Sequence, residues 1–214
     1  MPLPDHYQDN SKGDVFGSFH INHRKYEEYA HIIEFTIRGK SSTVKKKEGV
    51  IIQAIGEERL TLLELLGDPS KNFEIGERVY IGRESRNKII SVLGRLNYND
   101  LSDSARNEIP IALEKIVDIK EKKFVDFFNN AQPITPRVHG LELIPGIGKI
   151  YMKSIIAERE KKKFDSFNEI QERIGVKDLQ KLITKRIVEE IAGETRMNLF
   201  VRKWIGLDIM DKIF

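Results

Sequence analysis

A proline and two glycines within four positions constrain this chain more than any other local feature. They lie in "LELIPGIGK", residues 141–149, between apolar residues that would otherwise continue as a helix. Proline cannot continue a helix and glycine adopts positive φ at little cost, so residues 145–148 predict a tight turn between two helical segments. The C-terminal part of the chain is therefore expected to contain a helical hairpin.

The same turn has a chemical consequence. Backbone N–H groups that open a helix have no partner within it, and they lie at the positive end of the helix dipole. Because Gly146 and Gly148 carry no side chains, a phosphate can approach these groups, and Lys149 adds a full charge. A corner that joins two helices and binds nothing is an equally open interpretation of these four residues alone.

The N-terminal half of the chain has the pattern expected of short β-strands. In "YAHIIEFTIRG", residues 29–39, the apolar residues Ile33, Phe35 and Ile37 alternate with polar ones, as in a half-buried strand. Four further short apolar segments follow between polar turns, at 49–56, 59–67, 78–82 and 88–94. Closely spaced strands of this kind predict a small OB- or S1-like β-barrel over residues 26–97.

After the last expected strand, the apolar period becomes helical. Ser102 is placed to cap a helix that Pro110 is expected to interrupt. The apolar residues beyond it are assigned to the core: Leu113, Ile116, Val117, Phe124, Phe127 and Phe128. We expect an α+β protein with an irregular arm over 1–25, the barrel, a helical connection over 98–132 and an all-α domain over 133–214.

Several functional classes lack support in the sequence. Cysteine is absent from the 214 residues, which excludes disulfides, cysteine-based zinc sites and cysteine nucleophiles. No run of about 18 apolar residues and no signal peptide is present, so a cytoplasmic protein is expected. His20 and His23 lack a second pair that would complete a metal site, and no Walker loop is present. We expect neither a cofactor nor a bound metal.

The segment "LELIPGIGKIYMKSIIAEREKKKFDSFNEIQERIGVKDLQKLITKRI" resembles the tandem helix-hairpin-helix module of DNA-uptake receptors and several repair proteins. The resemblance rests on the Gly-Ile-Gly turn and on the residues that follow it. These are the apolar Ile155 and Ile156, the position of Arg159, and the capping-box spacing of Ser166 and Glu169. It implies contacts with the sugar-phosphate backbone without readout of bases.

Two departures limit what this resemblance implies. Where the second hairpin should repeat the glycine pair, "IGVKD" has Gly175 and then Lys177, so a phosphate contact there stays open. Some DNA glycosylases carry the same hairpin together with a catalytic lysine and aspartate, but here those positions are Ile150 and Asn168. We therefore expect a protein that is not an enzyme.

Longer stretches are similar to an uncharacterised archaeal family whose members are described only as nucleotide- or nucleic-acid-binding proteins. These stretches are "LTLLELL", "EIGERVYIG", "FVDFFNNAQPITPRVHGLELIPGIGK" and "LFVR". They cover nearly everything after about residue 26. The similarity implies a barrel followed by helical hairpins, and no established reaction.

We predict non-sequence-specific binding of nucleic acid, DNA or RNA, through backbone phosphates. The net charge of +3 decides nothing by itself. The predicted contacts lie at the two hairpins, in the basic segment 38–47, which is expected to be a loop between barrel strands, and in 83–88. They are Gly146, Ile147, Gly148, Lys149, Lys153, Gly175, Lys177, Arg38, Lys40, Lys45, Lys46, Lys47, Arg83, Arg86 and Lys88. The alternative is a structural module that docks a protein partner in a translation or repair assembly.

Overall fold

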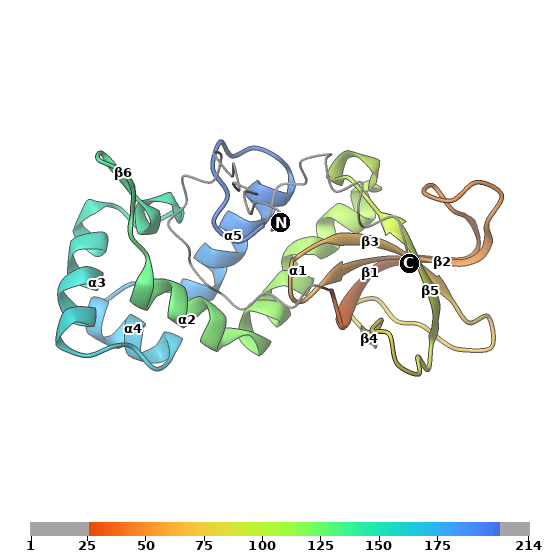
Figure 1. The fold of residues 1–214 in the computed structure, drawn as a ribbon, viewed down its shortest axis with the longest axis horizontal. Helices are drawn as coiled ribbons and strands as arrows, with labels where there is room; N and C mark the ends of the chain where they lie inside the picture. Colours follow the sequence, from red (N-terminus) through yellow and green to blue (C-terminus); the bar gives the residue numbers. More distant parts are fainter. Residues whose placement is uncertain (1–25, 202–214) are drawn as a thin grey trace, which may run out of the picture.

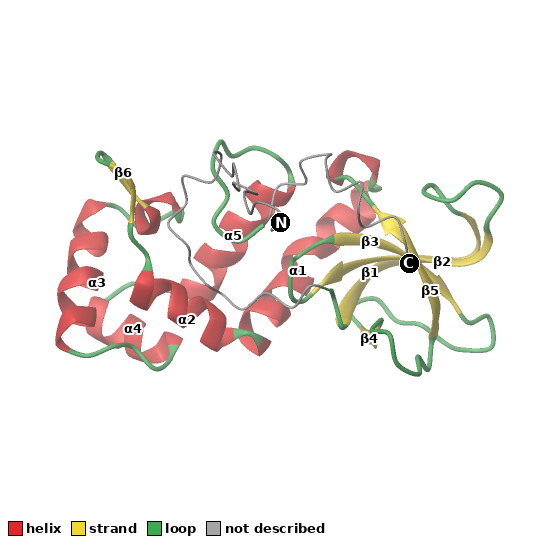
Figure 2. Cartoon of the chain, viewed as in Figure 1, coloured by secondary structure: helices red, strands yellow, loops and turns green. Residues whose placement is uncertain are grey.

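The structure, a computed structural model, describes residues 26–201. The arm expected over 1–25, which includes His20 and His23, lies outside the described residues. Within them, a curled antiparallel five-stranded sheet is combined with five α-helices. Figures 1 and 2 show the sheet at one end of the long axis and the helices α3 and α4 at the other. The predicted α+β class is therefore confirmed.

The sheet is formed by β1 (Tyr29–Lys40), β2 (Glu48–Gly56), β3 (Leu62–Gly67), β4 (Arg78–Tyr80) and β5 (Ile89–Arg95). Its strand order is β4-β1-β2-β3-β5, and every neighbouring pair is antiparallel. The register between β1 and β2 shifts at two points, and irregularities of this kind bend a strand. The edge strands β4 and β5 are not paired with each other, so the sheet curls into a half-barrel and does not close.

The alternation predicted for β1 holds over only part of the strand. Ile32 packs in an apolar cluster formed by the strands and the turns between them. The adjacent Ile33 packs in the cluster that contains the helices, so both faces of this part of the strand are buried. Farther along, Phe35 is half-buried and Ile37 is 68% exposed. The reason is that the helix α1 covers the first part of β1, while the second part extends past it (Figure 1).

The helices are α1 (Asp103–Ile119), α2 (Glu121–Asn130), α3 (Lys149–Lys161), α4 (Phe167–Ile174) and α5 (Leu179–Ile191). A 3-10 turn, η1 (Tyr98–Asp100), precedes α1. Between α2 and α3 the chain forms a small hairpin of β6 (Pro133–Thr135) and β7 (Val138–His139), followed by the 3-10 turn η2 (Gly140–Leu143). The expectation of an all-α domain over 133–214 is therefore wrong for its first residues, which pair as two short strands.

The start of α1 agrees with the sequence, but its middle does not. The Ser102 hydroxyl accepts a hydrogen bond from the Ala105 N–H at 3.0 Å, as expected of an N-cap. The prediction that Pro110 interrupts the helix is wrong, because α1 continues through it. An internal proline costs about 3 kcal/mol. Burial of neighbours such as Ile109 and Leu113 offsets this cost, at about 1.5–3 kcal/mol for each large apolar side chain.

One apolar core runs from the helical side of the sheet through α1 to α5. All six apolar residues assigned to the core of the connection are buried, which confirms that prediction. The turn between β2 and β3 is also attached to the helices. The Lys120 ammonium lies 2.5 Å from the Glu58 carboxylate, and Lys123 donates to the Glu58 carbonyl at 2.7 Å. Sheet and helices are thus held together by apolar and ionic contacts.

Candidate functional site

Residues 145–148 lead the chain from η2 into α3, and Gly146 makes this turn possible. Its φ of +88° lies in the region that favours glycine. A Cβ here would also lie 3.2 Å from the Leu182 side chain of α5. Ile147 is only 2% exposed, and its N–H donates to the Ile144 carbonyl at 3.0 Å. Ile147 therefore anchors the turn in the core.

Gly148 is the N-cap of α3 and leaves the start of this helix uncovered. Apart from the adjoining backbone, no atom of the described residues lies within 4 Å of the position that a Cβ on Gly148 would take, and none of their side chains caps the helix. The first bond of the helical ladder runs from the Met152 N–H to the Gly148 carbonyl at 2.9 Å. The N–H groups of residues 149–151 thus have no acceptor within the helix and are suited to bind an anion.

Exposed lysines lie on both helices that meet at this turn. Lys149 and Lys153 are exposed on α3, whose first turn contains no acidic residue. Lys181 and Lys185, exposed on α5, flank Leu182, which contacts the turn. The sequence does not predict these two lysines, because only the packing of α5 against the turn brings them there.

The second predicted contact, at Gly175 and Lys177, has a different geometry. Gly175 ends α4 in the left-handed region, with φ of +76°, and Lys177 is exposed. The Leu179 N–H at the start of α5 already donates to the Gln171 side-chain oxygen at 3.2 Å. This helix start therefore offers fewer N–H groups to an anion than the start of α3.

Arg159 and Ser166, which contribute to the resemblance to hairpin modules, stabilise the helices. The Arg159 guanidinium donates to the carbonyls of Phe128 at 2.9 Å and Ala131 at 2.8 Å, which ties α3 to the end of α2. The Ser166 hydroxyl accepts from the Glu169 N–H at 3.1 Å, as its spacing predicts.

The basic segment 38–47 is not a loop over its whole length, so that prediction is wrong for its first residues. β1 continues to Lys40, because residues 39 and 40 pair with the start of β2. Arg38 and Lys40 therefore lie on a strand, and Lys40 is 3.4 Å from the Glu48 carboxylate. Lys45, Lys46 and Lys47 are exposed in the loop that follows.

A buried carboxylate holds this basic loop against the sheet. Glu64 of β3 accepts from the backbone N–H groups of Ser42 at 2.9 Å and Thr43 at 3.1 Å, and from the Ser41 hydroxyl at 2.5 Å. Burial would raise the pKa of Glu64, but these hydrogen bonds outweigh it and lower the pKa to about 2. The Thr43 side chain also packs against Gly94 of β5. The start of the loop is therefore fixed.

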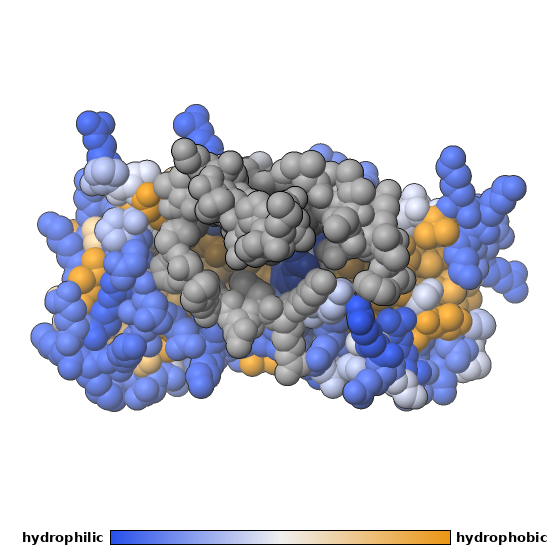
Figure 3. All heavy atoms as spheres, viewed as in Figure 1, coloured by the Kyte–Doolittle hydropathy of each residue, from blue (hydrophilic) through white to orange (hydrophobic). Residues whose placement is uncertain are grey.

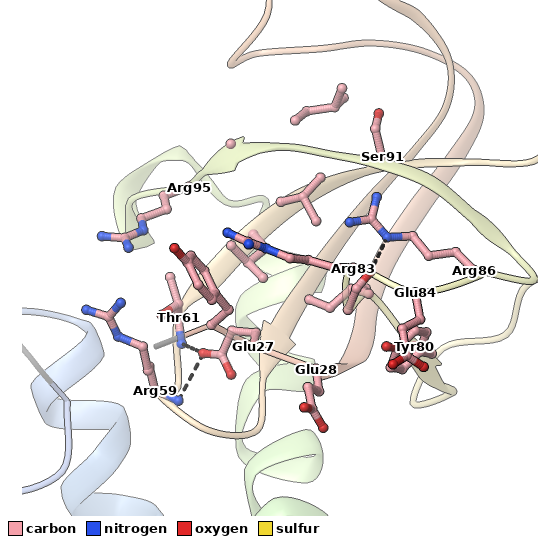
Figure 4. Close-up of a pocket in the computed structure, with 17 residues that line it drawn as sticks. Glu27, Glu28, Arg59, Thr61, Tyr80, Arg83, Glu84, Arg86, Ser91 and Arg95 are labelled. Atoms are coloured by element: carbon pink, nitrogen blue, oxygen red, sulfur yellow. Dashed lines mark hydrogen bonds between the residues drawn. The ribbon is translucent and has the colours of Figure 1, made fainter. Parts of the chain in front are cut away.

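A cleft of about 870 Å³ opens where the half-barrel fails to close, between the segment after β4 and strand β5 (Figure 4). Its lining combines arginine and tyrosine side chains: Arg59, Arg83, Arg86, Arg95, Tyr26 and Tyr80. The structure thus places two of the predicted residues, Arg83 and Arg86, in one cleft. No sequence motif marks Arg59 and Arg95, which come from other segments.

Lys88, the third predicted residue of this region, is engaged with the fold. Its ammonium lies 2.5 Å from the Glu77 carboxylate and 2.9 Å from the Asn72 carbonyl. In a space-filling view, apolar side chains gather on the surface at the sheet end, while the end formed by α3 and α4 is mainly hydrophilic (Figure 3). The predicted contacts therefore form two separate groups, at the α3 turn and at the sheet.

Two further properties concern residues 26–201. They contain no group of three or more histidine, aspartate or glutamate side chains placed to hold a metal ion. None of their helices combines the length and the apolar character needed to cross a membrane.

The chain is similar to proteins whose descriptions name no activity. Residues 26–202 match a family model described as "Protein of unknown function (DUF655)". The chain is 41% identical over 183 residues to Uncharacterized protein MJ0038 of Methanocaldococcus jannaschii, covering 85% of this chain and 82% of that protein. The crystal structure of Af1531 from Archaeoglobus fulgidus, family-model DUF655, superposes with a TM-score of 0.72 at 39% identity. That comparison covers 82% of this chain and 100% of the other, so the similarity includes both sheet and helices.

Proposed function

This chain belongs to the DUF655 family, and we propose that it is a non-enzymatic protein that binds the phosphate backbone of nucleic acid, DNA or RNA. The observation that supports this most is the uncovered start of α3. There Gly148 leaves the N–H groups of residues 149–151 open beside Lys149 and Lys153. A phosphate satisfies such N–H groups without any contact to a base, so the binding is independent of sequence.

We further interpret the helices that flank the two turns as a tandem helix-hairpin-helix module. The positive φ of Gly146 and the open N-cap at Gly148 support the first hairpin as the one that binds phosphate. The second hairpin serves mainly as packing support, because Gln171 occupies the N–H of Leu179. The curled sheet is interpreted as an OB- or S1-like half-barrel, supported by its five antiparallel strands.

The basic loop provides a second phosphate contact in this proposal. Lys45, Lys46 and Lys47 are exposed at the sheet end, and Glu64 fixes the residues that precede them. The α3 turn lies toward the other end of the long axis (Figure 1). A nucleic acid that touches both sites must extend along the molecule, so long oligonucleotides should bind more tightly than short ones.

The test is fluorescence anisotropy with labelled single- and double-stranded DNA and RNA at low and moderate salt. Affinity should fall steeply as salt rises, because binding to phosphates releases counterions. Lys149→Glu should weaken binding about tenfold or more through lost attraction and added repulsion. Lys122→Glu, at an exposed position of α2, is the matched control and should bind normally. Circular dichroism checks that both variants fold. If none of the four nucleic acids binds, the proposal is wrong.

A second candidate function rests on Ile150, whose side chain is 82% exposed beside Lys149. An apolar side chain displayed in this way suits a structural module that docks a protein partner in a translation or repair assembly. The two functions respond differently to mutation and salt. Docking should be weakened by Ile150→Ser and be nearly indifferent to salt, whereas phosphate binding should survive Ile150→Ser and weaken with salt.

A further inference from the structure

We propose that the cleft between β4 and β5 binds a phosphorylated nucleoside, with its phosphate among the arginines and its base against a tyrosine ring. The nucleoside is either a free mononucleotide or one unit of a single strand. Binding of a unit of a single strand rests on the proposed function, whereas binding of a free mononucleotide does not. The cleft volume of about 870 Å³ falls within the range of roughly 300–1,000 Å³ that is typical of small-molecule sites.

Arginine side chains define the phosphate end of the cleft. In Figure 4 the guanidinium groups of Arg59, Arg83 and Arg95 extend toward the same end, whereas Glu84 lies toward the other. Arg95 is exposed, and none of the carboxylates in residues 26–201 is paired with it. A guanidinium presents a planar set of donors that matches phosphate, and several of them favour a phosphate over a carboxylate ligand.

One carboxylate in the lining of the cleft, that of Glu27, is compensated by hydrogen bonds from the backbone. Glu27 accepts from the backbone N–H groups of Glu58 at 2.6 Å, Arg59 at 3.0 Å and Thr61 at 3.3 Å. Burial nevertheless raises the pKa of the Glu27 carboxyl, against the effect of these hydrogen bonds. The same bonds fix the turn that carries Arg59, so one wall of the cleft is rigid before any ligand binds.

The loop after β4 is also held in place. The Arg86 guanidinium donates to the Gly82 carbonyl at 2.7 Å and to the Ile90 carbonyl at 3.3 Å, which bridges the two ends of this loop. Arg86 is therefore a positioning residue. Arg83, between these anchors, is presented to the cleft from a defined backbone.

Two tyrosine rings supply surfaces for a base. The Arg83 guanidinium lies 4.3 Å from the centre of the Tyr26 ring. Tyr80 packs edge-on against Tyr29, with ring centres 5.2 Å apart. The Tyr80 hydroxyl occupies the space that a Cβ on residue 82 would need. Glycine at position 82 thus allows Tyr80 to line the cleft. Every base has a flat face, so stacking on tyrosine accepts bases of different identity.

The cleft adjoins the basic loop through one strand. Gly94 of β5 lines the cleft, and the Thr43 side chain from the start of the loop packs against it. A strand with one nucleotide in the cleft can therefore continue toward Lys45, Lys46 and Lys47. A duplex would have to unpair a base to enter, so the cleft favours single strands.

The experiment measures binding of the full chain to a fluorescent nucleoside 5′-monophosphate and to a short labelled single-stranded oligonucleotide. The unphosphorylated nucleoside serves as a competitor. Arg95→Glu should weaken binding of both probes about tenfold or more, because charge-assisted contacts to phosphate are lost. Tyr26→Ser should also weaken both. Arg137→Glu, an exposed arginine in the β6–β7 turn, is the matched control and should have no effect.

Each outcome bears on the proposal. Saturable binding of the monophosphate that Arg95→Glu abolishes supports a free nucleotide as ligand, and binding of the oligonucleotide alone supports a strand. Absence of binding to both probes, or binding that a folded Arg95→Glu retains, overturns the proposal. Lys149→Glu distinguishes binding in the cleft from binding at the α3 turn, since that variant should bind duplexes more weakly and bind the monophosphate normally.

Discussion

The Leu182 side chain of α5 lies 3.2 Å from the position that a Cβ on Gly146 would occupy. The φ of Gly146, +88°, also favours glycine, so both packing and backbone geometry require this residue. Gly148 differs: its φ is −84°, and apart from the adjoining backbone no atom of the described chain lies within 4 Å of its Cβ position. The two glycines of one turn therefore have separable roles. Gly146 shapes the turn, and Gly148 exposes the helix start.

Gly146→Ala should lower the free energy of unfolding by about 1–3 kcal/mol, through left-handed strain and contact with Leu182. Urea unfolding followed by circular dichroism measures this change. Gly148→Ala is the matched control, and it should lower the free energy of unfolding by less, at most about 1 kcal/mol, which is the usual preference for glycine over alanine at an N-cap. Equal losses in the two variants would contradict the distinction.

Gly148→Val should reduce affinity for nucleic acid about tenfold while changing the free energy of unfolding by less than about 1 kcal/mol. The branched side chain keeps an allowed φ but occupies the space through which a phosphate approaches residues 149–151. Anisotropy titrations of the wild type and the variant measure the effect. Unchanged affinity would show that no phosphate binds at this helix start.

Glu64→Gln should flatten the loss of stability at acid pH. The folded pKa of Glu64, about 2, lies below its ordinary value of 4.5. Its stabilising contribution is therefore complete above about pH 5 and is lost as the pH falls from 4.5 toward 2, a loss on the order of 3 kcal/mol. Thermal unfolding from pH 7 to pH 2 should show wild type and variant converging at low pH. Glu48→Gln, at an exposed carboxylate, is the control. If the stability curve of Glu64→Gln stays parallel to that of the wild type, the lowered pKa of Glu64 is refuted.

Arg159→Lys should lower the free energy of unfolding by about 1–2 kcal/mol, because an ammonium cannot reproduce the forked contact with the Phe128 and Ala131 carbonyls. Affinity for nucleic acid should stay unchanged in the folded variant. Thermal unfolding and anisotropy together check this, with Arg137→Lys as the exposed control. A loss of affinity without a loss of stability would instead indicate that Arg159 contacts the ligand.

Predictions from the sequence succeeded where the physics is local and failed where distant contacts intervene. Ser102 caps α1 because a cap depends on backbone atoms three residues away. Pro110 does not end that helix, because burial against other elements outweighs a lost backbone bond. The alternation predicts Ile37 on the buried face of its strand, but Ile37 is exposed, because the coverage of a strand depends on what packs over it.

By itself, the sequence determined that the chain turns at residues 145–148 and that the strands of the five-stranded sheet precede the α-helices. Those features depend on backbone dihedral angles and on side-chain periodicity within a few residues. Only the tertiary structure decided which charged side chains meet. Arg59, Arg83 and Arg95 come together because the sheet curls without pairing β4 to β5. The register of strands that lie far apart in sequence sets that arrangement, and no local pattern contains it.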